Sequence, residues 1–375
     1  MLRRENESLR SQARGGGEVS VPQELINLTE KEFALRFLTK PVVRRIAADE
    51  LRDRIAAAIE SRLGPAGVDD RQEACTLIGW LRPGDDLLSQ LSAILSTGTG
   101  GWFDEDAGEG WMPDKTDLKN IPDQAALVRL LARILLHQHF PPAEEYPGDD
   151  AARAQAALHE GAAAGAEARF YAEKARSIGF MPMKANKDME LLLASLPPFL
   201  QGLANFPVIE GKGLADSLHV AGDGKFQAAF RNPPQTTRAI FYPGEPATEP
   251  KALDLPATPE EPFLTESAGQ LGLRLWLEPL GDAEQAAEIA SCWKNDRYVF
   301  FPNGESSSAV LWDIELDSKD AADKLQSAAL QIASNLGKAG DSSGKRNLLV
   351  TRPSPVRVRF LNTFEPATAA ALGAK

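Results

Sequence analysis

The chain has 375 residues, a length that predicts two domains or one large domain with an appendage. Its formal charge of -12 argues against nucleic acid as a partner, because phosphate binding needs a basic face, and its hydrophobic content of 43% excludes a wholly disordered chain. Two cysteines, Cys75 and Cys292, are too few for a disulfide framework or a Cys-rich zinc site. The four histidines leave little material for His-based catalysis.

Residues 1–20 are expected to form a flexible N-terminal stub. They open with basic residues but have no apolar core behind them, so they lack the pattern of a signal peptide. Leu2 and Leu9 lie one heptad apart, and a short coiled coil is the alternative to a solvated helix. No stretch approaches the ~20 apolar residues of a transmembrane helix. We therefore expect a cytoplasmic location for the chain as written, with export or membrane tethering through an upstream segment as the alternative.

Residues 21–245 are expected to form a predominantly helical domain. Apolar residues recur there at helical spacing, with charged residues between them and prolines or glycines at the ends. A short β-hairpin is expected where 102–104 and 110–112 flank an acidic turn that contains glycine. The expected helices span about 48–63, 87–95, 124–139, 151–175, 188–204 with a break at two prolines, and 213–230.

A Pro-rich linker over 246–262 is expected to lead into a C-terminal α+β module over 263–365. Leu273, Leu275 and Leu277 alternate with other residues, which predicts a half-buried strand over 272–278. A few antiparallel strands backed by two helices would place the whole chain in the α+β class, with helices predominant. The other expected elements are strands at 297–302, 309–316, 347–351 and 356–361 and helices at 283–293 and 319–336.

Five short segments carry a family resemblance. They are QHF at 138–140, ALHEGA at 157–162, NPPQTT at 232–237, NDRY at 295–298 and WDIELDSKDA at 312–321. In order and spacing they resemble a family of uncharacterised bacterial proteins that look like zinc metallopeptidases of the HExxH, gluzincin type. Its members carry a helix reading HELVHALQDQHF and a later helix containing AL-x-EGDA. The resemblance implies a metallopeptidase-like helical domain over 21–245.

The metal-binding positions of that motif are altered in this chain. In an HExxH helix two histidines one turn apart bind zinc, the Glu beside the first is the general base, and a Glu from a later helix can be the third ligand. By the resemblance, the histidine positions are Arg129 and Arg133 here, and the catalytic Glu position is Leu130. A guanidinium group has no free lone pair and leucine cannot accept a proton. Only the third-ligand position remains, as Glu160.

Two further motif positions depart from the family. Ala162 stands where the EGDA motif has an acid, and Tyr242 stands where members have a later histidine. The resemblance therefore implies a catalytically inactive relative without a metal or other cofactor. We expect Arg133, with Arg129 as a second candidate, to pair with Glu160 in the old zinc cavity, because a buried carboxylate needs a partner. The alternative is that both arginines are exposed and unrelated to Glu160.

The histidines offer a rival interpretation. His137 and His139 point about 200° apart on a regular helix and cannot chelate one metal from it. A metal site rebuilt from His139, His159 and Glu160, with His137 nearby, would make the chain a hydrolase. The favoured interpretation is a non-catalytic binding or scaffolding protein with a peptide or protein partner, no nucleic acid and no membrane segment. No motif specifies an oligomeric state.

Overall fold

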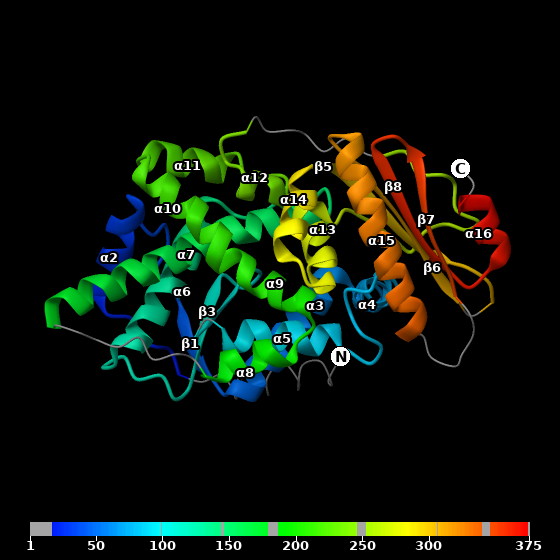
Figure 1. The fold of residues 1–375 in the computed structure, drawn as a ribbon. Helices are drawn as coiled ribbons and strands as arrows, with labels where there is room; N and C mark the ends of the chain where they lie inside the picture. The colour runs from blue at the N-terminus through cyan, green and yellow to red at the C-terminus, as the bar shows by residue number, and fades with distance from the viewer. Residues whose placement is uncertain are drawn as a thin grey trace, which may run out of the picture.

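The computed structural model describes residues 17–98, 100–143, 146–178, 187–245, 253–305, 307–339 and 346–373. The fold is α+β and predominantly helical, as predicted, with one small sheet among the helices and one five-stranded sheet near the C-terminus (Figure 1). Most of the predicted stub (1–16) and part of the predicted linker (246–252) lie outside the described residues. Among the described helices, none combines the length and the apolar character needed to cross a bilayer.

The first half of the chain builds the helical part around two long helices, α6 and α7. Pro122 lies in the first turn of α6, where no backbone donor is needed, and Asp149 and Asp150 place acids in the first turn of α7. The elements here are α2 (Gln23–Phe33), β1 (Val43–Ile46), α3 (Ala48–Leu63), α4 (Pro65–Ile78), α5 (Leu87–Thr97), β2 (Trp102–Asp104), β3 (Glu109–Pro113), α6 (Ile121–His139) and α7 (Asp149–Ile178).

The predicted hairpin is present as β2 and β3, which pair in antiparallel fashion. A third strand, β1, was not predicted and pairs in parallel with β3, so the strand order is β1-β3-β2. Helix α6 lies close against this sheet. A Cβ on Gly110 would lie 2.8 Å from Cδ2 of Leu130, so glycine permits the close approach. The turn of the hairpin lies beside the region of α6 that carries Arg133, since Glu105 in that turn contacts this arginine.

Six shorter elements continue the helical part. The helix predicted over 213–230 is two helices, because Gly222 adopts a φ of 100° between them, which is favoured only for glycine. A π-helical turn also precedes the first of the two. The elements are α8 (Lys187–Ser195), α9 (Pro198–Phe206), η1 (Pro207–Gly211), α10 (Lys212–Val220), α11 (Asp223–Arg231) and α12 (Thr237–Phe241).

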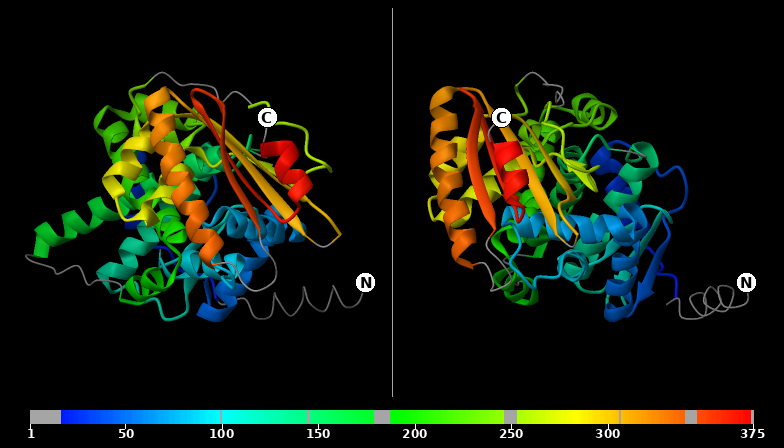
Figure 2. Two further views of the ribbon diagram at one scale, coloured as in Figure 1. Left: turned by 45° about the vertical axis from the view of Figure 1, so that its right-hand side comes forward. Right: turned by 90° about the vertical axis from the view of Figure 1, so that its right-hand side faces the viewer.

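The C-terminal part is a fully antiparallel sheet with helices on both faces (Figure 2). Alternate residues of β5 point to opposite faces of the sheet. Tyr298 and Phe300 join the main core, and Val299 and Phe301 pack with Leu372 of α16. The strand order is β4-β5-β6-β8-β7. The elements are β4 (Leu264–Glu266), α13 (Gly269–Leu277), η2 (Glu278–Leu280), α14 (Ala283–Ser291), β5 (Trp293–Pro302), β6 (Ser308–Leu316), α15 (Lys319–Ala339), β7 (Asn347–Ser354), β8 (Arg357–Thr363) and α16 (Pro366–Gly373).

The predicted strand over 272–278 is wrong, because this segment belongs to helix α13. The alternation of leucines suggested one buried face and one exposed face. In the structure Trp276 is only 2% exposed, as buried as the leucines beside it, and its indole nitrogen donates to the carbonyl of Ile78 at 2.9 Å. A short helix surrounded on all sides has no exposed stripe, so its sequence lacks the helical period.

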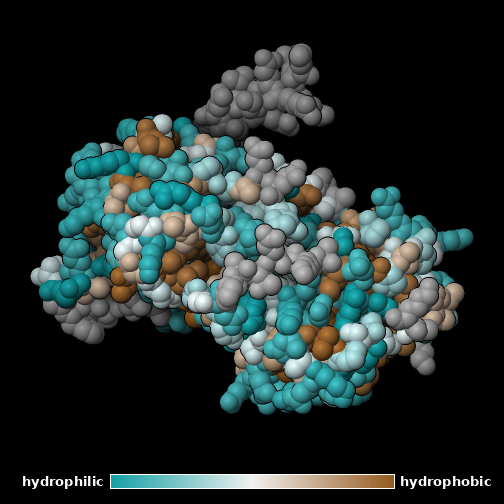
Figure 3. Space-filling model, turned by 90° about the horizontal axis from the view of Figure 1, so that it is seen from above, coloured by the Kyte–Doolittle hydropathy of each residue, from teal (hydrophilic) through white to brown (hydrophobic). Residues whose placement is uncertain are grey.

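The helical part and the C-terminal sheet share one hydrophobic cluster. Trp80, just after α4, stacks on Phe199 at 4.7 Å and meets the ring of Trp312 edge-on at 5.3 Å. Asn362 of β8 donates to the carbonyl of Leu77 at 2.7 Å. Viewed from above, the surface is mainly hydrophilic with small separate apolar patches (Figure 3). The contacts of Trp80 and Asn362 thus join the helical part to the C-terminal sheet.

Candidate functional site

Helices α6 and α7 bring Arg129, Arg133 and Glu160 together. Arg129 Nη2 lies 3.2 Å from Glu160 Oε2, and Arg133 Nη1 lies 3.1 Å from Glu160 Oε1. Each oxygen of the Glu160 carboxylate therefore faces a different guanidinium group. The contact with Arg129 is a hydrogen bond, whereas the contact with Arg133 is an ion pair without hydrogen-bond alignment. Both arginines thus contact Glu160, and the alternative of exposed, unrelated arginines is wrong.

Two more acids extend this network. Glu167 lies two turns after Glu160 on α7, and its Oε2 is 3.3 Å from Arg129 Nη1. Arg133 Nη2 lies 2.6 Å from Glu105 Oε1, in the turn of the hairpin. Two arginines thus connect three carboxylates that come from α7 and from the small sheet. We call Arg129, Arg133, Glu105, Glu160 and Glu167 the Arg–Glu network.

Burial and charge act in opposite directions on these acids. Burial would raise the pKa of Glu160, but the guanidinium groups of Arg133 and Arg129 outweigh burial and hold that pKa below its ordinary value. Burial raises the pKa of Glu167, and Arg129 offsets this only in part. Glu160 is therefore ionised at neutral pH, with both oxygens committed to arginine.

The remaining motif positions carry no proton-transfer group into the network. Leu130 is buried against the small sheet, and Ala162 is buried within the core. Tyr242 follows α12 and is partly exposed, with the guanidinium group of Arg238 4.9 Å from its ring centre. These positions serve packing and surface contacts.

The histidines divide as helix geometry predicts. His139 Nε2 lies 2.7 Å from the carbonyl oxygen of Arg36, whereas His137 faces a cavity that His159 also lines. The rebuilt metal site of His139, His159 and Glu160 is therefore not formed. Within the described segments, no three His, Cys, Asp or Glu side chains come together as a group that could hold a metal ion.

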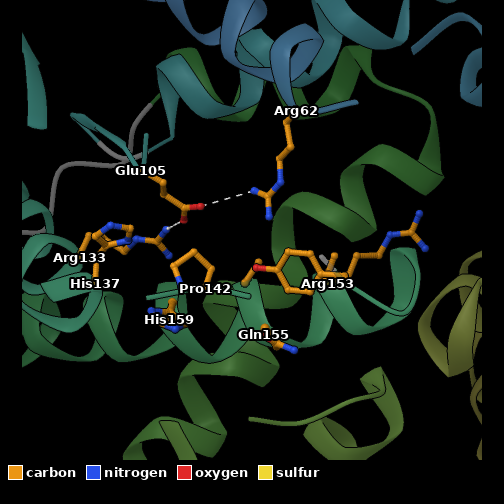
Figure 4. A pocket seen from close by; sticks show the side chains of 11 residues that line it. Arg62, Glu105, Arg133, His137, Pro142, Arg153, Gln155 and His159 are labelled. Atoms are coloured by element: carbon orange, nitrogen blue, oxygen red, sulfur yellow. Dashed lines mark hydrogen bonds and ion pairs between the residues drawn. The ribbon is translucent and has the colours of Figure 1, made fainter. Parts of the chain in front are cut away.

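A cavity of about 250 Å³ adjoins the Arg–Glu network (Figure 4). Three of its residues, Arg133, His137 and His159, are candidates from the sequence, whereas the cavity itself was not predicted. Burial, together with the nearby charge of Arg133, lowers the pKa of His159 to about 3, so this ring is neutral at physiological pH. Burial also lowers the pKa of His137. The lining residues are Arg62, Glu105, Arg133, His137, Pro142, Tyr146, Ala152, Arg153, Gln155, Ala156 and His159.

A second buried polar cluster lies where α7, α13 and the C-terminal sheet meet. Asp296, in the NDRY segment, accepts five hydrogen bonds, which is enough to satisfy both oxygens of a carboxylate. The donors are the Ser267 hydroxyl, the Ala268 and Gly269 amides, and the indoles of Trp293 and Trp312. Asp296 therefore holds the start of α13 against the sheet, which is a structural role.

Asp150 is the other buried acid at this junction. Its Oδ1 accepts from the Thr237 amide at 3.1 Å and from the Thr237 hydroxyl at 2.6 Å, while its Oδ2 has no partner within the described residues. Burial raises the pKa of Asp150 to about 7. Gly269 has a φ of 71°, and a Cβ there would lie 1.7 Å from Asp150 Oδ1, so this contact requires glycine.

Comparisons with known proteins reach only the C-terminal part. A family model described as a domain of unknown function (DUF8575) matches residues 261–365, a range that begins just before β4 and ends just after β8. The match covers less than half of the chain and carries no activity. No curated protein and no solved structure matches the chain.

Proposed function

We propose that this chain is a non-catalytic binding or scaffolding protein with a metallopeptidase-like helical part, in which the Arg–Glu network occupies the former zinc site. The supporting observation is that Glu160 lies between Arg129 and Arg133. Both arginines stand at zinc-ligand positions of the HExxH pattern, and a guanidinium group cannot ligate zinc. The position of the general base is Leu130, which cannot accept a proton. The helix pair is kept while its chemistry is lost.

The proposed partner is a peptide or another protein. The cavity beside the Arg–Glu network is concave and carries both charged and apolar side chains, as ligand sites do. The formal charge of -12 disfavours nucleic acid. A scaffold keeps such a surface without needing a reactive centre.

Restoring the zinc ligands tests this proposal directly. In the double variant Arg129→His/Arg133→His, two imidazoles one turn apart would face Glu160, the ligand set of a His₂Glu zinc site. We expect the purified double variant to retain about one zinc per chain, measured by inductively coupled plasma mass spectrometry. Adding Glu160→Ala should abolish that zinc, and the wild type should retain none.

Two outcomes would contradict the proposal. A double variant that folds, by circular dichroism, but retains no zinc would mean that these helices do not derive from a metal site. Stoichiometric zinc in the wild type that disappears in Glu160→Ala would mean that the chain still binds metal and would favour the rival hydrolase.

A further inference from the structure

The cavity beside the Arg–Glu network contains polar groups that make no hydrogen bond with the described residues. Gln155 is 6% exposed and lines the cavity from α7, yet its amide makes no hydrogen bond with any residue in the described part of the chain. The Nδ1 atom of half-buried His137 is itself buried and likewise has no partner among the described residues. A buried polar atom without a partner costs free energy, and the Gln155 amide adds an uncommitted donor and acceptor, so both groups are available to a ligand.

Arg62 supplies the most available positive charge. Its guanidinium group enters the cavity from α3, and its only described ion pair, with Glu105 Oε2, spans 3.5 Å (Figure 4). The same carboxylate is held far more closely by Arg133, at 2.6 Å. The Arg62 group also lies 5.1 Å from the ring centre of Tyr146, which limits its orientations. Most of its five donors are therefore free to meet an incoming acceptor.

The charge of the wall favours an anion at Arg62. Arg133 also lines the cavity, but its charge is already paired with Glu105 and Glu160, at 2.6 and 3.1 Å, which leaves Arg62 as the loosely paired cation. Arg153 also lines it, but its guanidinium group points away (Figure 4) and pairs with Asp149 at 3.3 Å. Two alanines and a proline also line the cavity, so the space accepts apolar atoms as well. Its volume lies below the ~300–1,000 Å³ of typical ligand pockets, which limits the occupant to a small group.

We propose that this cavity binds a carboxylate carried on a small, partly apolar body, with Arg62 as its charge partner and Gln155 as a hydrogen-bond donor. The carboxylate is either that of a free short-chain organic acid or the C-terminus of a peptide. Arginine suits this task because its planar fork matches the two oxygens of a carboxylate. The proposal rests on the proposed function only in treating the cavity as a binding site of a non-catalytic protein.

Isothermal titration calorimetry of the full chain at pH 7 tests the site with three probes: sodium butyrate, the tripeptide Ala-Ala-Leu, and the same tripeptide as its C-terminal amide. We expect both carboxylates to bind saturably and the amide to bind roughly tenfold more weakly or worse, the scale of one charge-assisted hydrogen bond. Tighter binding of the tripeptide than of butyrate identifies a peptide C-terminus as the source. Equal or tighter binding of butyrate identifies a free acid.

Matched variants assign the binding to the cavity. Arg62→Leu and Gln155→Leu should each weaken carboxylate binding, and Arg62→Lys should weaken it less than Arg62→Leu. Arg52→Leu is the control, since Arg52 lies on the same helix but contacts Ser89 outside the cavity. Absence of saturable binding by both carboxylates, or an affinity unchanged in Arg62→Leu, overturns the proposal. Neither residue contacts Glu160, so the zinc test can succeed or fail independently.

Discussion

At the scale of single residues, Arg129 and Arg133 fix which helical faces meet. A buried ion pair adds little net stability, because desolvating both charges costs about as much as their attraction returns. Removing one partner is costly, since it leaves a carboxylate buried and unpaired. Glu160 contacts both arginines, so α6 and α7 cannot slide by a turn without losing a partner. The network therefore contributes specificity of packing more than free energy.

The raised pKa of Asp150 predicts that the stability of the protein depends on pH. Burial raises its pKa to about 7 in the folded state, whereas an unfolded chain has about 3.9. Between these values the folded state binds more protons than the unfolded state, so this residue lowers the free energy of unfolding as pH rises. Asp150→Asn keeps an oxygen for Thr237 but cannot titrate. We expect the free energy of unfolding of the wild type, minus that of the variant, to fall by up to about 1.4 kcal/mol per pH unit from pH 5 to 7.

Urea denaturation at pH 5, 6, 7 and 8 measures this difference. The relevant charged neighbours of Asp150 are Asp149, Arg153 and Asp296, which both proteins share. Asp85→Asn is the control: hydrogen bonds from Arg82 outweigh burial and lower the pKa of Asp85, so its contribution is lost only as pH falls below about 4. Parallel pH profiles of wild type and Asp150→Asn would contradict the expected titration.

Some of these residue contacts can be predicted from sequence and others cannot. Helical spacing predicts that Arg129 and Arg133 share one face of α6, and the family resemblance supplied the expectation that this face meets Glu160. Glu167 lies two turns beyond Glu160 on the same face of α7, so helical spacing could have identified it. Glu105 cannot be assigned in this way, because its contact with Arg133 depends on how the hairpin packs against α6. Local periodicity predicts contacts along a helix and not contacts between distant segments.

At the scale of elements, the backbones of α7 and η1 approach each other closely at two glycines. A Cβ on Gly161 would lie 2.1 Å from the carbonyl carbon of Gly211, and a Cβ on Gly211 would lie 2.2 Å from the Ala157 oxygen. Neither clash can be relieved by a side-chain rotation, because the opposing atoms belong to the backbone. Gly161→Ala should therefore push the two elements apart and lower the free energy of unfolding by about 2 kcal/mol.

Gly213→Ala is the matched control for Gly161→Ala. Gly213 lies in the neighbouring helix α10, where a Cβ would meet no atom within 4 Å. In that setting alanine should be neutral or stabilise by up to about 1 kcal/mol, because glycine is the weaker helix former. Urea unfolding monitored by circular dichroism compares the two variants. A Gly161→Ala protein as stable as wild type would show that the two backbones separate without cost.

The elements differ in how well sequence predicts them. Helices α6 and α7 and the strands β5 to β8 are recognised because each has its own apolar period or its own turn signals. Strand β1 is missed because four residues, two of them arginine, pair in parallel with a strand more than sixty positions later. Helix α13 is misread as a strand because burial on every side leaves no helical stripe. The failures occur where long-range packing decides the structure.

At the scale of the whole molecule, the helical part and the C-terminal sheet meet through aromatic rings. Trp80 stacks on Phe199 and also contacts the rings of Tyr298 and Trp312 edge-on, at 6.0 and 5.3 Å. Buried hydrogen bonds to the carbonyls of Leu77 and Ile78 flank this contact. The sheet face next to α4 is therefore completed by side chains from the first half of the chain, although the family match begins only at residue 261.

This shared core predicts that Trp80→Ala destabilises both parts together. Deleting a fully buried tryptophan costs about 3–5 kcal/mol, and here the vacated space borders the helices and the sheet alike. Hydrogen exchange followed by mass spectrometry should show amides of α7 and of β6 losing protection by the same factor. Trp102→Ala is the control, because Trp102 is half-buried against the satellite cluster of Ile46 and Leu51 and should loosen only the small sheet. Lost protection confined to the C-terminal sheet in Trp80→Ala would mean that the two parts unfold independently.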